Sequence, residues 1–118
     1  MSNIEIGKYG EKLACEFLIK KGYRIIETNY RYSKYGEIDI IAADKDVLCF
    51  IEVKTRTNNR FGTPMEAITK DKLLKIYTCI KNYRAKNGLK FKRARIDAVS
   101  IELNKDGAKI THIENLEI

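Results

Sequence analysis

Residues 36–56 read Gly-Glu-Ile-Asp-Ile-Ile-Ala-Ala-Asp-Lys-Asp-Val-Leu-Cys-Phe-Ile-Glu-Val-Lys-Thr-Arg, two apolar segments joined by the polar triplet 44–46. Apolar runs this continuous predict two central strands that are buried on both faces, with helices covering both sides of the sheet. Four charged residues interrupt these strands, namely Glu37, Asp39, Glu52 and Lys54. A buried charge is costly unless it is paired or binds an ion, so the same hairpin also predicts a functional site.

Strand periodicity places Glu37 and Asp39 on one face, and likewise Glu52 and Lys54, because residues two apart share a face. If the numbers of paired residues add to an odd number, as for Ala43 opposite Asp46, all four charges lie on the same face. Asp39 and Glu52 are then near enough to share an ion. The residues expected to fill this face toward the turn are Ile41, Leu48 and Phe50. Those expected on the opposite face are Ile38, Ile40, Val47, Cys49, Ile51 and Val53.

A helix is predicted before the hairpin, from a cap at Ser2 or Asn3 to about Lys21, with Gly22 as its terminator. Its apolar stripe consists of Ile6, Gly10, Leu13, Ala14, Phe17 and Leu18. Gly10 would allow another chain segment to approach closely. Glu11 lies at the edge of the stripe, where the helix alone favours an ordinary half-exposed side chain over a site acid. Residues 23–30 follow as a strand.

The segment after the hairpin predicts a helix and a second hairpin. Residues 63–66 (Thr-Pro-Met-Glu) form one helix start and Thr69 a second, with the helix ending near Lys86. Its expected apolar stripe is Leu73, Ile76, Tyr77, Ile80 and Tyr83. Residues 95–103 and 108–113 alternate as strands around a turn at 104–107, the second strand at the sheet edge. The predicted order is therefore α-β-β-β-α-β-β.

The charge distribution favours a nucleic-acid partner. The net charge is +7, and residues 72–95 contain nine basic residues and no acidic one. A merely solvated helix face usually mixes the two signs, whereas a phosphate-binding surface is basic. The candidate nucleic-acid-binding residues are Arg56, Lys72, Lys75, Arg84, Lys92, Arg93 and Arg95.

The chain of 118 residues is expected to form one domain spanning 1–118. The three cysteines are far apart and in apolar surroundings, which argues against a disulfide framework and for a reducing compartment. No stretch approaches the roughly 18 apolar residues of a membrane span, so we expect a cytoplasmic protein without a membrane partner. The single histidine, His112, lies alone in the sequence and is expected to have no functional role.

Cleavage of a phosphodiester is one chemistry that would use these charges, because Mg²⁺ takes hard oxygen ligands and neutralises phosphate charge. Asp39, Glu52 and the carbonyl of Val53 can supply such ligands, and Lys54 can orient or deprotonate a water. A solvent-facing ion pair of Glu52 and Lys54 is the simpler alternative. Glu-x-Lys alone is a weak signal, strengthened here by the apolar strands and the preceding acidic strand.

The residues Gly36-Glu37-Ile38-Asp39 and Phe50 to Arg56 resemble the PD-(D/E)XK superfamily of restriction-endonuclease-like and Holliday-junction-resolvase-like nucleases. Further residues resemble the small bacterial YraN-like family, described as endonuclease-like. They are Gly10-Glu11, Gly62, Pro64, Glu66-Ala67, Lys72 and Arg95-Ile96-Asp97. Ile38 stands where the superfamily often has proline.

The resemblance implies a restriction-endonuclease-like α/β fold, a three-layer core with a central mixed sheet flanked by helices. It implies metal-binding acids at Asp39 and Glu52, a catalytic lysine at Lys54 and a further acid at Glu11, with Mg²⁺ or Mn²⁺ as one or two ions. Glu37 is either a further ligand or a partner of Arg56. A homodimer is also implied.

The leading hypothesis is therefore a metal-dependent endodeoxyribonuclease acting on DNA, with branched or damaged DNA as candidate substrates. A nucleic-acid-binding protein that keeps the fold with little turnover is the first alternative, and a structural or adaptor protein with solvated ion pairs is the second. The presence of Asp39, Glu52 and Lys54 together favours the enzyme.

Overall fold

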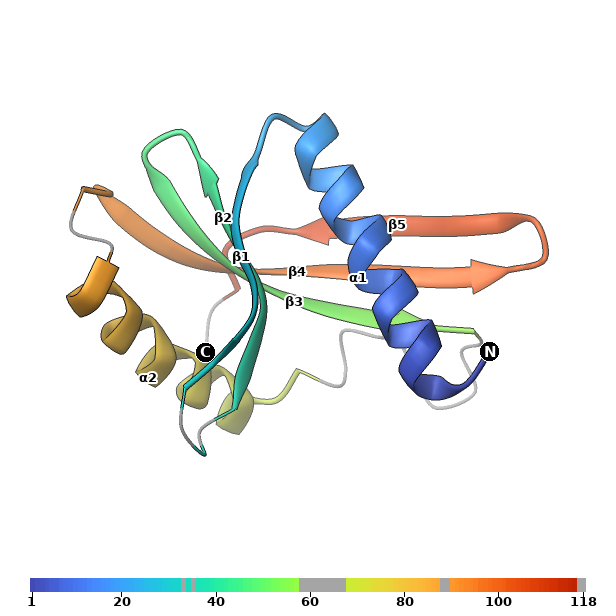
Figure 1. Cartoon of the computed structure of the whole chain (residues 1–118), viewed down its shortest axis with the longest axis horizontal. Helices are drawn as coiled ribbons and strands as arrows, with labels where there is room; N and C mark the ends of the chain where they lie inside the picture. The colour runs from blue at the N-terminus through green and yellow to red at the C-terminus, as the bar shows by residue number, and fades with distance from the viewer. Residues whose placement is uncertain (33, 35, 58–67, 88–89, 117–118) are drawn as a thin grey trace.

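The computed structural model describes residues 1–32, 34, 36–57, 68–87 and 90–116. Its element order is α-β-β-β-α-β-β, as the sequence predicts (Figure 1). The elements are α1 (Asn3–Lys20), β1 (Arg24–Arg31), β2 (Glu37–Asp44), β3 (Val47–Arg56), α2 (Lys70–Asn87), β4 (Arg93–Asn104) and β5 (Gly107–Ile113).

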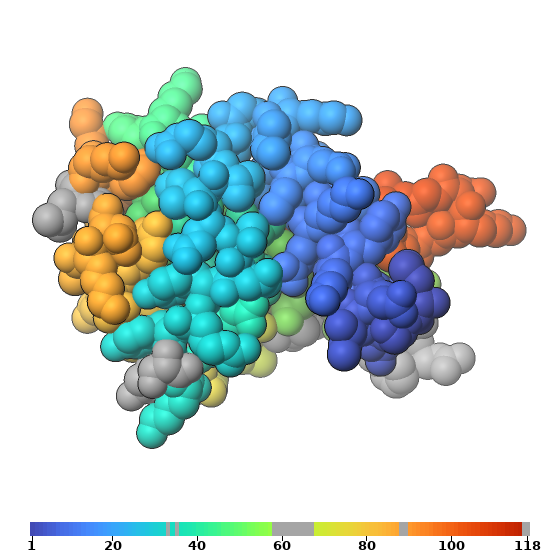
Figure 2. Space-filling view, in the orientation of Figure 1, coloured from blue at the N-terminus to red at the C-terminus, as the bar shows by residue number. Residues whose placement is uncertain are grey.

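The five strands form one mixed sheet in the order β1-β2-β3-β4-β5. The β3–β4 pair is parallel, and the other three pairs are antiparallel. Helix α1 packs on one face, over a core cluster that includes Ile40, Cys49 and Ile51. Helix α2 packs on the other face, over a cluster that includes Ile41 and Phe50. The result is the expected three-layer α/β arrangement, from which the β4–β5 hairpin projects at one end (Figure 2).

Helix α1 begins and ends as the sequence predicts. Ser2 and Glu5 form a reciprocal capping box, and Gly22 follows the helix with a left-handed φ of 95°. The buried residues of α1 are Gly10, Ala14 and Leu18. At Gly10 the Thr55 side chain of β3 lies so close that an added Cβ would sit 1.8 Å from its Oγ1. The absent side chain therefore lets the helix rest on β3.

The β2–β3 hairpin has the predicted parity, and its turn lies within the predicted residues 44–46, although the pairing differs from the example. Ala43 pairs with Leu48 rather than Asp46, and Asp44 pairs with Val47, so the turn is Lys45-Asp46 with a φ of 56° at Lys45. The sum of paired numbers is still odd. The predicted parity therefore holds for the paired residues from Ile40 to Ile51. Glu37 lies outside this pairing and lines a pocket with residues of α1, whereas Glu52 contacts Lys72 of α2, so these two acids do not share a face as predicted.

Ile38 departs from the predicted alternation, because it joins the α2-side cluster while Ile40 lies on the α1 side. The β2–β3 pairing ends at Ile40 and Ile51, whereas β2 continues to pair with β1 through Tyr30 and Ile38. A two-stranded ribbon twists more than a wide sheet, which accounts for the turned side chain.

Helix α2 begins after Thr69, whose Oγ1 accepts a hydrogen bond from the Lys72 backbone N–H at 3.2 Å. The other predicted start, residues 63–66, lies outside the described residues. The predicted stripe is wrong at Tyr77, which is 39% exposed, while Cys79 is buried in its place. No helix in the described parts of the chain is long and apolar enough to cross a membrane.

The cysteines behave as predicted for small apolar residues. Cys49 and Cys79 are buried, Cys15 is half-buried, and all three are free.

Candidate metal centre in the β2–β3 hairpin

The centre forms where β2 and β3 stop pairing. Ile40 and Ile51 are the last paired residues, so Asp39 and Glu52 come next on the two strands. Asp39 Oδ2 accepts a hydrogen bond from the Val53 backbone N–H at 2.8 Å. The carboxylate of β2 is thereby fixed against β3, at the point where a longer ladder would have continued.

Glu52 is an acid in the interior, with only 3% of its surface exposed. Its Oε2 lies 3.1 Å from the Lys72 ammonium of α2. Its Oε1 is buried and accepts no hydrogen bond from the described residues. An orphaned carboxylate oxygen is costly in the interior, and a cation is the partner that suits it.

Asp39 is held in an environment that disfavours its charge. Burial, the nearby charge of Glu52 and, to a lesser degree, that of Glu11 raise the pKa of Asp39 to about 7, although the Val53 hydrogen bond and Lys72 oppose this shift. Two carboxylates that share a desolvated site are destabilised until a cation joins them. The donor set of Asp39 and Glu52 therefore fits a divalent ion with hard oxygen ligands, as Mg²⁺ requires.

Lys54 and Lys72 form a pair beside these acids. Burial and the hydrogen bond with Lys72 lower the pKa of Lys54. Burial also acts against the Lys72 ammonium, but the hydrogen bond with Lys54 and the charge of Glu52 outweigh it and raise the pKa of Lys72. The two lysines therefore differ in their protonation: the environment favours the charged form of Lys72, and it lowers the free energy needed to deprotonate Lys54.

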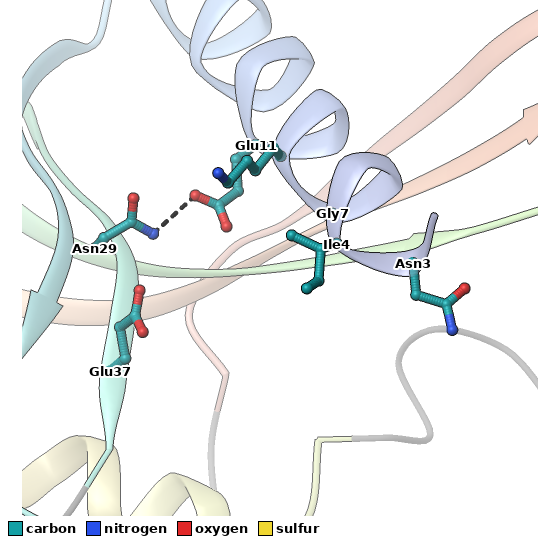
Figure 3. A pocket seen from close by; sticks show the side chains of 7 residues that line it. Asn3, Ile4, Gly7, Glu11, Asn29 and Glu37 are labelled. Carbon is teal, nitrogen blue, oxygen red and sulfur yellow. Dashed lines mark hydrogen bonds between the residues drawn. The ribbon is translucent and has the colours of Figure 1, made fainter. Parts of the chain in front are cut away.

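Glu11 reaches the same region from α1 but does not touch Asp39 or Glu52 in any hydrogen bond. Its Oε1 accepts a hydrogen bond from Asn29 Nδ2 at 2.8 Å (Figure 3). It lines an open pocket of about 340 Å³ with Glu37, whose carboxylate lies across from it. Glu37 pairs with Arg31 at 3.2 Å, so among the described residues it is Arg31, and not the Arg56 of one predicted alternative, that is its partner.

The other basic candidates are dispersed. Lys75 pairs with Asp71 at 3.3 Å, and Lys92 pairs with Asp46 at 3.7 Å. Arg84 donates to the Phe91 carbonyl at 3.2 Å. Arg93 is exposed and Arg56 is half-buried. These residues are spread over α2, the start of β4 and the end of β3.

Arg95 is placed differently from the rest, because its side chain is only 13% exposed. It donates to Asp97 and Glu114 and lies 3.6 Å from Asp44. Burial and these hydrogen bonds hold the guanidinium against Asp97 and Glu114. Its contacts within the protein therefore give Arg95 a structural role, and its predicted contact with nucleic acid stays a prediction.

A cluster around Asp97, in which His112 takes part, was not expected from the sequence. Asp97 is fully buried and meets His112 Nε2 at 2.9 Å, the Arg95 guanidinium and the Asn115 backbone N–H. Asp97, His112 and Glu114 each offer a ligand atom within 4.8 Å of one another. Arg95 already supplies the positive charge there, so the cluster is satisfied without a metal. The charged Asp97 between apolar residues was the sequence signal for it.

Two residues at the candidate metal centre were not predicted as part of it. From the sequence, Lys72 is assigned to the nucleic-acid-binding surface, and Asn29 is not among the predicted site residues. The structure brings Asp39, Glu52, Lys54 and Lys72 together, with Glu11 and Asn29 at one side. The Lys72–Glu52 contact depends on how α2 lies on β3, which residue spacing does not specify.

Comparison with known proteins matches residues 10–101 to one family, described as "Uncharacterised protein family UPF0102". A UPF0102 protein of Dictyoglomus thermophilum is 47% identical over 107 residues, covering 91% of this chain and 90% of that protein. UPF0102 proteins of Alkaliphilus oremlandii and Clostridioides difficile are each 43% identical over 115 residues, covering 96% and 98% of this chain and 97% and 98% of theirs.

Proposed function

Since the chain belongs to the uncharacterised protein family UPF0102, whose name states no activity, we propose its function from the site: a divalent-metal-dependent endonuclease that hydrolyses DNA. We further propose that the centre is of the PD-(D/E)XK type. The observation that carries the proposal is the buried Oε1 of Glu52, which has no hydrogen-bond partner in the described parts of the chain and lies beside Asp39, whose pKa is raised to about 7. This pair of carboxylates is costly to the fold, and a cation would relieve it.

Asp39 and Glu52 would hold Mg²⁺ or Mn²⁺ through their carboxylate oxygens, with the Val53 carbonyl as an additional donor. Val53 is already at the site, because its N–H binds Asp39. When bound, the ion supplies charge neutralisation at the phosphate and lowers the pKa of a coordinated water. Glu11 lies close enough to affect the pKa of Asp39 and adds a further carboxylate at the pocket.

Lys54 is proposed as the group that orients the attacking water or accepts its proton at Nζ. Its lowered pKa supports this role, since a neutral amine is needed to accept a proton near neutral pH. Lys72 keeps its charge and can stabilise the negative phosphate. The two lysines would divide the work of proton transfer and charge stabilisation between them.

A panel of end-labelled substrates tests the proposal: linear, flapped, four-way-junction and single-stranded DNA, and RNA, each with Mn²⁺, Mg²⁺ or EDTA. We expect metal-dependent cleavage of at least one DNA substrate, lost in Asp39→Asn and reduced at least ~100-fold in Lys54→Ala. Asp106→Asn, in the exposed β4–β5 turn, is the matched control and should cleave as the wild type does. Equal cleavage by Lys54→Ala and the wild type would point to a contaminating nuclease. DNA binding without cleavage would favour the binding protein with little turnover.

A further inference from the structure

Both the backbone and the side chain of Lys72 are held by specific contacts. It lies in the first turn of α2, and its backbone N–H is bound to the Thr69 side chain. Its ammonium lies 3.1 Å from Glu52 Oε2, with relative side-chain exposures of 36% for Lys72 and 4% for Glu52. The start of the helix therefore delivers one positive charge to the buried acid of β3.

The carboxylate of Glu52 cannot bind both the Lys72 ammonium and a divalent ion without bringing the two positive charges close together. A divalent ion at Glu52 would either take Oε2, and so replace the ammonium, or take the unpartnered Oε1. In the second case the two cations are separated by little more than one carboxylate group, and in a desolvated site like charges at that range repel strongly.

We propose that Lys72 is a resident countercation of Glu52 that a divalent metal must displace, so that Lys72 lowers the metal affinity of the free protein. This inference rests on the proposed metal centre. It assigns Lys72 a function in regulating metal occupancy, which is distinct from contact with DNA along a basic surface. Metal entry then releases an ammonium group beside the site.

The ion pair also has a structural reason to exist without the metal. A carboxylate that is only 3% exposed destabilises the fold unless a positive charge compensates it, and Lys72 supplies that charge from a neighbouring element. Because Lys72 is still 36% exposed, its side chain can turn toward solvent when another cation arrives. A fully buried lysine could not leave Glu52 in this way, and it would prevent the metal from replacing it.

Isothermal titration of the metal-free full-length chain with Mn²⁺ alone tests the inference. Lys72→Gln removes the charge and keeps a hydrogen-bond donor, and it should bind Mn²⁺ roughly tenfold more tightly than the wild type. Lys72→Met is a second neutral variant, used if Lys72→Gln does not fold. Lys72→Arg keeps the charge and should bind as the wild type does or more weakly. Lys75→Gln is the matched control, because Lys75 pairs with Asp71 on the exposed side of the same helix.

Thermal unfolding of each variant with and without Mn²⁺ gives a second readout, since a tighter ligand raises the melting temperature more at equal concentration. Wild-type binding together with unchanged or weaker binding by the neutral variant that folds would overturn the inference and leave the metal centre intact. Binding by the neutral variants but not by the wild type would support it. Absence of binding by all variants would overturn the metal centre itself, and with it the role of Lys72.

Discussion

Asp39 accepts a hydrogen bond from the Val53 backbone N–H, at 2.8 Å, across the point where β2 and β3 stop pairing. The Asp39 side chain thus provides a hydrogen bond between β2 and β3 where their backbone pairing has ended, at the position of the candidate metal centre. Because this bond alone does not offset burial and the nearby charge of Glu52, the pKa of Asp39 is raised to about 7.

Asp39→Asn should stabilise the protein above pH 7. A carboxyl whose pKa is higher in the folded state makes its favourable contribution when protonated, at low pH, and loses it as the pH rises through about 7. The variant avoids this loss, so we expect it to be more stable than the wild type by about 1–3 kcal/mol at pH 8 and by less than that at pH 5. Urea unfolding at both pH values measures the difference. An equal effect at both would show that Asp39 is not responsible.

Metal binding should release a proton from Asp39, since the ion needs the ionised carboxylate. We expect Mn²⁺ affinity to rise between pH 6 and pH 8, and the heat of binding at pH 6.5 to depend on the ionisation enthalpy of the buffer. Titrations in two buffers at each pH test this directly. A buffer-independent heat at pH 6.5 would mean that Asp39 is already ionised there.

Gly10→Ala should destabilise the fold by about 1–3 kcal/mol, because the new methyl group would overlap the Thr55 side chain. Gly7→Ala is the control in the same helix. Nothing lies within 4 Å of a Cβ at Gly7, and alanine favours the helix by up to about 1 kcal/mol. Opposite signs of the two effects in chemical denaturation are the expected result. A Gly10→Ala variant as stable as the wild type would mean that Thr55 can turn away.

Asp97→Asn should cost about 3–5 kcal/mol of stability, because Arg95 would be left without its buried partner. Burial opposes the charge of Asp97, but hydrogen bonds from His112 and Arg95 outweigh this and lower its pKa. A lowered pKa gives stability that is present above the unfolded-state pKa of about 3.9 and is lost as the pH falls through the folded-state value. Acid titrations followed by circular dichroism should therefore show a transition that Asp97→Asn weakens.

Charge reversal of exposed basic residues tests the DNA surface separately from the site. Lys75→Glu with Arg93→Glu should weaken DNA binding and reduce the salt dependence of the affinity by about one unit of slope per lost phosphate contact. Lys109→Glu on β5 is the control, since Lys109 is exposed on the projecting hairpin. Fluorescence anisotropy across a salt series gives both quantities. Unchanged slopes would place the DNA elsewhere.

The sequence predicts the order of elements because each strand and helix carries its own periodic pattern. It also predicts that Asp39 and Glu52 lie near each other, in agreement with the effect of the Glu52 charge on the pKa of Asp39. It is wrong about Ile38, whose orientation depends on where β2 leaves β3. It is equally limited for Lys72, because the placement of α2 on the sheet is a tertiary property that no local pattern contains.

His112 shows the same limit on the other face of the sheet. Its residue type alone gave no reason to expect a contact, and its partner Asp97 lies on the neighbouring strand. A buried acid among apolar residues signals that a counter-charge exists somewhere. Which residue provides it becomes evident only when β5 and the segment after it return to β4.

The parallel β3–β4 pair has a consequence for the order of folding. Val47 pairs with Arg93, 46 residues later (93 − 47), whereas Ile40 meets Ile51 across a tight turn. Loop closure makes the short-range hairpin the faster event, because its strands are joined by a tight turn, whereas Lys72 of α2 lies 20 residues after Glu52 (72 − 52). Asp39 and Glu52 therefore come together while their positive partner on α2 is still absent. Their mutual repulsion acts on the nascent hairpin, so the residues proposed for catalysis would slow the chain's own folding.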